Sequence, residues 1–180
     1  MNTTAQQQDT PTTSGEGYQV FRTRNAPSLD ETAHMELADV TPDLETGIGT
    51  ALEAGFADGN IVKTLFSRPG FSLTYAWFKS GFPLPLHTHN VDCLYYVVAG
   101  SLQLGTDTLG PGDGFFVGAG KAYRYTPGPE GVEVLEFRSE EDFNINFLAK
   151  TVPAWEKISK VIADRRPAWA NETPPSNALA

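Results

Sequence analysis

Two of the three histidines in this 180-residue chain stand at positions 87 and 89, inside the string GFPLPLHTHNVDCLYYVVAG. Residues two apart in a β-strand point to the same face, so this spacing sets His87 and His89 side by side on one wall. Neutral imidazole is a common ligand of zinc, iron and copper. The pair therefore predicts a metal-binding wall, and the plainer alternative is two barrel histidines that bond only to their neighbours.

A further candidate ligand opens the next predicted strand, CLYYVVA. Alternation places Cys93, Tyr95 and Val97 on one face with Leu94 and Tyr96 on the other, and alternation alone leaves open which face is buried. As a thiolate, Cys93 would be a metal ligand; as a thiol it would be a small buried apolar residue, which is how most free cysteines behave. Tyr95 is a candidate for proton transfer, with packing as its alternative role.

The run VEVLEFR carries a carboxylate that would complete such a site. Val132, Val134, Glu136 and Arg138 share one face of this strand. If that face lines the interior, Glu136 supplies a carboxylate ligand or catalytic group and Arg138 orients it. Two histidines and one carboxylate would then resemble the facial arrangement of non-haem iron oxygenases.

These residues lie in a series of short β-rich runs between Ile61 and Phe147, divided by Gly, Pro, Asp and Asn. Such a series is typical of an all-β domain. After it, Trp155, Ile158 and Ile162 fall at i, i+3 and i+7 and predict one amphipathic helix over 153–165. The predicted organisation is a disordered tail (1–18), an N-terminal extension that packs on the barrel (19–60), a β-barrel (61–150), the C-terminal helix (151–170) and a second disordered tail (171–180).

Within the N-terminal extension the pattern is ambiguous. Thr41 followed by Pro42 is typical of a helix start. Gly47 and Gly49 would weaken any helix that followed, because glycine loses more backbone freedom than other residues when it enters a helix.

The composition excludes several classes of protein. Thirteen basic and 22 acidic side chains give a net charge of −9, which argues against nucleic acid or an anionic membrane as the partner. One cysteine forms no internal disulfide, and the N-terminus has no basic and apolar signal sequence, so we expect a cytoplasmic protein. The apolar runs are far shorter than the roughly 20 residues that span a bilayer.

The motif around the two histidines resembles the first motif of the cupin superfamily. Gly81, His87, His89 and Gly100 match it at the right spacing, and its glutamate position falls on Cys93. The second cupin motif maps more weakly, with Gly112 and Gly120 matched and Gly118, Tyr123 and Pro127 in place of its proline, histidine and asparagine.

The resemblance implies a single cupin jelly-roll β-barrel of the small RmlC-like type, closed by the C-terminal helix. It also implies a divalent transition metal (Fe, Mn, Ni, Cu or Zn). At the ligand positions of the family motifs this chain has His87, His89 and Cys93, which would bind the metal. Tyr123 would bind it as a phenolate or leave that coordination position open. Cupin domains often pair through sheet edges, so we expect a homodimer.

The function predicted from this resemblance is that of a metalloenzyme acting on a small carbonyl, enol or aromatic substrate, as a dioxygenase or a lyase. Tyr123 or Tyr95 would transfer the proton, with Glu136 as the other catalytic candidate. Three alternatives stay open. They are a non-catalytic ligand-binding or sensor protein, a metal-independent isomerase or lyase that uses Tyr and Cys, and a structural or storage protein.

Overall fold

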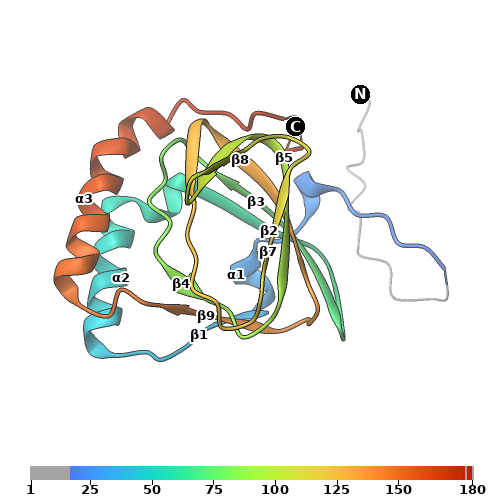
Figure 1. Ribbon diagram of the computed structural model, residues 1–180, viewed down its shortest axis with the longest axis horizontal. Coiled ribbons are helices and arrows are strands. Elements are labelled where there is room, and N and C mark those ends of the chain that lie inside the picture. The colour runs from blue at the N-terminus through green and yellow to red at the C-terminus, as the bar shows by residue number, and fades with distance from the viewer. Residues whose placement is uncertain (1–16, 177, 180) are drawn as a thin grey trace, which may run out of the picture.

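A computed structural model describes residues 17–176, 178 and 179 (Figure 1). The predicted N-terminal tail therefore lies almost wholly outside the described residues. In the part of the chain that the structure describes, no helix is both long and apolar enough to cross a bilayer.

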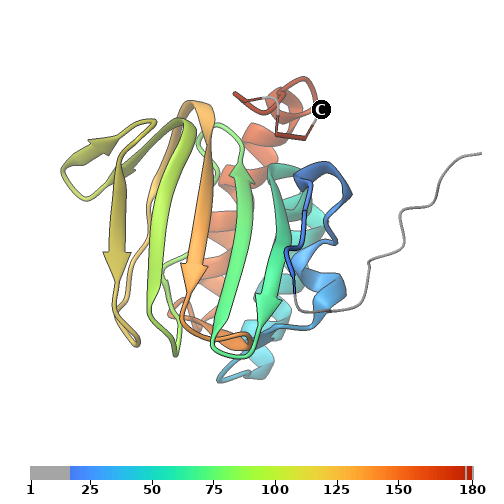
Figure 2. The ribbon, with the colours of Figure 1, turned by 90° about the vertical axis from the view of Figure 1, so that its right-hand side faces the viewer.

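The larger of two sheets has six strands, and all its pairs are antiparallel (Figure 2). Its strands are β2 (Asn60–Arg68), β3 (Phe71–Phe78), β5 (Cys93–Leu104), β6 (Asp107–Leu109), β7 (Gly114–Val117) and β8 (Thr126–Arg138). They run in the order β2-β3-β8-β5-β6, and β7 pairs with β5. The β-branched and aromatic residues of these runs favour strands, which is why the sequence pattern identified them.

A smaller sheet supplies the opposite wall. It joins β1 (Met35–Leu37), β9 (Phe143–Phe147) and β4 (His87–Thr88) in the order β1-β9-β4, with β1 parallel to β9 and β4 antiparallel to it. The mostly β architecture of two sheets with a C-terminal helix confirms the predicted jelly roll. The parallel partner β1 comes from the N-terminal extension, so this extension is part of the barrel wall.

The helices α2 (Pro42–Ala54) and α3 (Val152–Trp169) cover one side of the barrel. They lie at the left in Figure 1 and behind the six-stranded sheet in Figure 2. The helical segments are η1 (Thr23–Asn25), α1 (Leu29–Thr32), α2 (Pro42–Ala54), η2 (Phe56–Gly59) and α3 (Val152–Trp169). The predicted C-terminal helix is therefore confirmed, and α3 is longer than the range 153–165 that its apolar pattern predicted. Helix α2 begins as Thr41 indicated, with its hydroxyl accepting from the Leu44 amide at 3.3 Å.

Gly47 does not prevent α2 from forming, because Trp155 of α3 packs directly on it. A Cβ at this position would lie 2.4 Å from the indole ring. The helix propensity of glycine predicted a weaker helix, whereas the structure gives Gly47 a packing role.

The outer face of the six-stranded sheet carries a second apolar cluster around Tyr75 and Trp77, which the C-terminal Leu179 covers. Glu133 is fully buried there and accepts hydrogen bonds from the Tyr75 hydroxyl at 2.5 Å and from the Ser176 amide and hydroxyl at 2.5 and 2.7 Å. A buried carboxylate needs such donors. The described part of 171–180 is thus docked on the sheet, which differs from the disordered tail that its composition predicted.

Candidate functional site

The two histidines predicted to share a wall line one cavity. His87 pairs with Phe147 of β9 and with Tyr123, exchanging backbone hydrogen bonds with Tyr123 at 3.2 and 3.1 Å. The rings of His87 and His89 lie 5.0 Å apart between centroids, and both are buried. The i, i+2 spacing therefore predicted their juxtaposition correctly.

Both imidazoles are oriented by backbone carbonyl oxygens. His87 Nδ1 lies 2.7 Å from the Pro85 oxygen, and His89 Nδ1 lies 2.5 Å from the Asn144 oxygen. Because a carbonyl only accepts, each Nδ1 carries the hydrogen and each Nε2 keeps its lone pair. Burial lowers the pKa of His87 and, with the Arg138 charge, lowers the pKa of His89 to about 3, so both rings are neutral at neutral pH. This is the tautomer of a metal-binding histidine.

Two tyrosines complete this wall. The phenolic oxygens of Tyr95 and Tyr123 are hydrogen-bonded to each other, and the Tyr123 ring lies 4.4 Å from the His87 ring. Burial, followed by the charge of Glu136, raises the pKa of both phenols. Both are therefore protonated at neutral pH and able to donate a hydrogen bond.

Tyr125 is a lining residue that the sequence analysis missed. It is buried, lines the same cavity and lies edge-on to Tyr95, with 6.3 Å between ring centroids. The signal was available in the string AYRYT, because residues 123 and 125 share one face of an extended chain.

The face of β8 that carries Glu136 and Arg138 points inward, which resolves the parity that the sequence left open. Arg138 Nη2 donates to Glu136, and its Nη1 donates to the Thr74 hydroxyl at 3.0 Å. The guanidinium carbon also lies 3.9 Å from the centroid of the Phe143 ring. Burial alone would lower the pKa of Arg138, but the charge of Glu136 outweighs it and raises that pKa, so Arg138 stays charged.

Cys93 is the cross-strand partner of Arg138. Its side chain is 1% exposed, and it is not among the described residues that line the cavity. Burial raises the pKa of its thiol to about 12, so it is a neutral thiol in this environment. The structure brings together His87, His89, Tyr95, Tyr123 and Glu136 on the cavity wall, and Cys93 lies next to this group without lining the cavity.

The donor set fits a transition metal held by few protein ligands. Among the described residues, no group of three or more His, Cys, Asp or Glu side chains is arranged to hold a metal ion. His87 and His89 nevertheless offer two neutral imidazoles with free Nε2 lone pairs. A metal on this pair would leave coordination positions for water or substrate.

The cavity has a volume of about 590 Å³ and a mostly apolar lining. The N-terminal extension supplies much of that lining, through Leu29, Met35, Ile48, Ala51, Leu52 and Phe56. Two cations reach the lining, and both have partners: Lys63 donates to the backbone oxygens of Arg24 and Ala26 at 3.3 and 3.0 Å, and Arg138 pairs with Glu136. The described walls thus favour an uncharged ligand.

No protein-family model matches the chain, and no curated protein matches it. Solved structures with similar folds include the polyketide cyclase RemF from Streptomyces resistomycificus, with 19% identity, a TM-score of 0.50, and coverage of 59% of this chain and 82% of that one. KdgF from Halomonas sp. is 22% identical over 47% of this chain and 82% of that one, with a TM-score of 0.43. An RmlC-like cupin from Shewanella frigidimarina is 23% identical over 46% of this chain and 78% of that one, with a TM-score of 0.43. At these identities the likeness is one of fold alone, and the RmlC-like structure among them is a cupin.

Proposed function

We propose that this cupin-fold protein is an enzyme that transfers a proton on a small, uncharged carbonyl, enol or aromatic compound in its cavity, in a lyase reaction. One observation carries the proposal: two neutral imidazoles and two hydrogen-bonded phenols share one wall of a mostly apolar cavity. Such a site presents a few polar groups that orient a ligand whose body packs against apolar side chains.

Tyr123 is the proton donor of this proposal. Its hydroxyl is bonded to that of Tyr95, so Tyr95 holds it in place. The negative charge of Glu136 raises the pKa of both phenols and so opposes premature loss of the proton. Glu136 forms an ion pair with Arg138, and we assign it this electrostatic role.

His87 and His89 would hold a divalent transition metal, Fe, Mn, Ni, Cu or Zn, through their Nε2 atoms. When bound, such an ion supplies Lewis-acid polarisation of a substrate oxygen or, for a redox-active metal, dioxygen chemistry. The anchoring of both Nδ1 atoms keeps the imidazoles in the ligating orientation.

A metal-independent lyase or isomerase is the second candidate. It is favoured by the absence, within the described residues, of a third His, Cys, Asp or Glu beside the two histidines. The phenol pair and the buried charge pair would then carry the reaction alone.

The test combines metal analysis with proton exchange. Protein purified without a metal-affinity tag is analysed by mass spectrometry as wild type, His87→Ala and His34→Ala, the last being the histidine outside the cavity. We expect metal in the wild type and in His34→Ala and its loss from His87→Ala.

Deuterium exchange into acetylacetone, followed by NMR, reports proton transfer, and oxygen uptake with catechol reports dioxygenase chemistry.

The outcomes separate the candidates. Exchange that requires metal and Tyr123 supports the metal-dependent lyase, and exchange that survives a chelator supports the metal-independent one. Oxygen uptake without exchange would make the protein a dioxygenase. Ligand binding to the cavity with neither activity would make it a binding or sensor protein and would overturn the proposal.

We also propose a homodimer formed through the exposed side of β5 and β7. Leu94, Tyr96 and Phe116 are 50%, 46% and 63% exposed there, and Leu94 pairs directly with Phe116. Apolar side chains clustered on one sheet face are typical of an interface. Light scattering after size exclusion should show a dimer, and Phe116→Glu should give a monomer; a wild-type monomer would overturn the proposal.

A further inference from the structure

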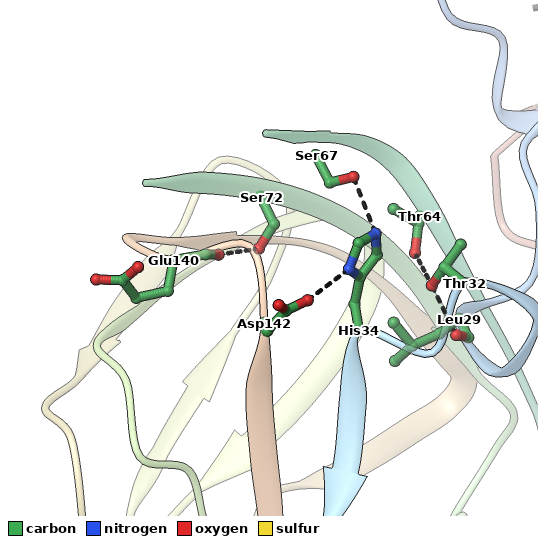
Figure 3. Close-up of polar contacts among 8 residues, drawn as sticks. All are labelled: Leu29, Thr32, His34, Thr64, Ser67, Ser72, Glu140 and Asp142. Atoms are coloured by element: carbon green, nitrogen blue, oxygen red, sulfur yellow. Dashed lines mark hydrogen bonds and ion pairs between the residues drawn. The ribbon is translucent and has the colours of Figure 1, made fainter. Parts of the chain in front are cut away.

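A second group of reactive side chains, which does not line the cavity, lies where β2 ends and where β1 and β9 begin (Figure 3). His34 Nδ1 lies 2.8 Å from a carboxylate oxygen of Asp142, and His34 Nε2 lies 3.1 Å from the hydroxyl oxygen of Ser67. Each of the two ring nitrogens therefore faces a different partner. Figure 3 shows the imidazole between the serine and the aspartate.

The hydrogen-bonding chemistry fixes the roles of these atoms. Because the Asp142 carboxylate only accepts, His34 Nδ1 carries the hydrogen of the neutral ring. The lone pair of Nε2 then faces the Ser67 hydroxyl, which donates to it. This is the order of contacts in the serine, histidine and aspartate triads of acyl-transfer enzymes.

Three separate elements position the group. Ser67 lies near the end of β2, His34 directly precedes β1, and Asp142 directly precedes β9. Ala33, with a left-handed φ of 55°, turns the chain immediately before His34, and the Phe143 amide donates to the His34 carbonyl at 2.9 Å. The backbone therefore holds His34 and Asp142 in register beside each other.

The neighbouring hydroxyl groups are bonded differently. Ser72, the cross-strand partner of Ser67, donates to the Glu140 carbonyl at 2.8 Å, and Thr32 donates to the Leu29 carbonyl at 2.8 Å. Thr64 contacts the Thr32 hydroxyl at 3.2 Å. Of the four hydroxyl groups drawn in Figure 3, that of Ser67 alone has a base as its partner.

The group is open to solvent. The side chain of His34 is 20% exposed and that of Asp142 is 81% exposed, while Ser67 is half-buried. None of the three lines the 590 Å³ cavity. A reagent can therefore reach this group without entering the proposed lyase site.

We propose that Ser67, His34 and Asp142 form a second reactive site, in which Ser67 is a nucleophile toward small activated esters. Ser67 Oγ attacks the ester carbonyl carbon while its proton passes to His34 Nε2. The bond to the leaving alcohol breaks, the alcohol takes the proton from His34, and Ser67 is acylated. Water then attacks the acyl carbon and gives a proton to His34, which returns it to Ser67 Oγ as the carboxylic acid leaves.

Asp142 is a positioning residue in this scheme. It holds the tautomer of His34 and stabilises the imidazolium that forms when Ser67 loses its proton. Its exposure to water reduces that stabilisation compared with a buried carboxylate. The alcohol of an activated ester is a better leaving group than the Ser67 alkoxide of the acyl-enzyme, so we expect acylation to be faster than hydrolysis and the acyl-enzyme to be observable.

The test is a burst of p-nitrophenol from p-nitrophenyl acetate, followed by peptide mass spectrometry. We expect one acetyl group on Ser67 per chain. Ser67→Ala should abolish the burst, and His34→Gln should slow it by roughly 100-fold or more. Ser72→Ala is the matched control and should leave the burst unchanged, because Ser72 has no base beside it. Acetylation of lysines or tyrosines in place of Ser67, or a burst that survives Ser67→Ala, would overturn the proposal.

A gain-of-function variant tests the base independently of ester binding. Ser67→Cys puts a thiol beside His34, and the native Cys93 is buried, so iodoacetamide reports on position 67. Alkylation should be faster in Ser67→Cys than in the double variant Ser67→Cys with His34→Gln, and equal rates would overturn the role of His34. His87→Ala should leave the burst intact, so the failure of the cavity proposal and of this one are distinguishable.

Discussion

Trp155 of α3 lies directly against Gly47 of α2, with no room between them for a methyl group. The indole is fully buried, donates from Nε1 to the Ala149 carbonyl at 2.8 Å, and lies edge-on to Phe147 with 5.3 Å between ring centroids. Trp155 also lines the cavity. The close approach of the two helices therefore shapes one wall of the proposed active site.

We expect Gly47→Ala to destabilise the protein by about 1–3 kcal/mol, because the new methyl group would force the indole or the helix to move. Gly49→Ala is the matched control on the same helix, where a Cβ meets no atom within 4 Å. It should stabilise the protein by about 0.5–1 kcal/mol through helix propensity. Urea unfolding measures both, and equal effects of the two substitutions would contradict the packing role of Gly47.

These two glycines also show which features of the fold could be predicted from the sequence. Both weaken a helix by the same intrinsic propensity, and only the tertiary contact of Gly47 with Trp155 distinguishes them. The juxtaposition of His87 and His89 was predictable, because it rests on the local period of an extended chain. Which face of β8 points inward could not be predicted. Alternation defines two faces, and only packing against the second sheet determines which of them is buried.

The N-terminal extension and the C-terminal segment were harder to predict for a related reason. Leu29 and Met35 line the cavity from outside the β-series, and Ser176 satisfies a buried carboxylate more than 40 residues away in the sequence. Neither contact has a local signature. The group of Ser67, His34 and Asp142 likewise joins residues from three distant parts of the sequence, so no local pattern indicates it.

Glu136 and Arg138 form a buried ion pair, and breaking it should be costly. Glu136→Gln leaves the guanidinium of Arg138 buried without its counter-charge, so we expect a loss of about 3–5 kcal/mol in the free energy of unfolding. The double variant Glu136→Gln with Arg138→Met removes the isolated charge and should recover most of that loss. Additive losses in a double-mutant cycle would contradict direct coupling of the two groups.

Tyr123→Phe separates proton transfer from packing. The ring remains beside His87, but the hydroxyl bonded to Tyr95 is lost. We expect proton exchange in the cavity to fall roughly 100-fold or more and stability to fall by about 1 kcal/mol. Tyr96→Phe, on the exposed face of β5, is the control that keeps both properties. Full exchange activity in Tyr123→Phe would remove Tyr123 from the mechanism.

Burial of His89 makes the stability of the metal-free protein fall in acid. Its pKa is about 3 in the folded chain and returns to its ordinary value of 6.5 on unfolding, so between these values the unfolded chain binds more protons. The free energy of unfolding therefore rises with pH in this window, by up to about 1.4 kcal/mol per pH unit from this group.

His89→Gln removes the contribution of His89 to the pH dependence of stability and keeps a polar side chain near the Asn144 carbonyl. Unfolding by urea in the presence of a chelator, from neutral pH to about pH 5, should show a shallower loss of stability in the variant than in the wild type. All other titrating groups are common to both proteins, so the difference between the two curves isolates His89. Parallel curves of stability against pH would mean that His89 takes up its proton as readily in the folded state as in the unfolded state. The folded protein would then not hold the imidazole as the neutral ligand that the cavity site requires.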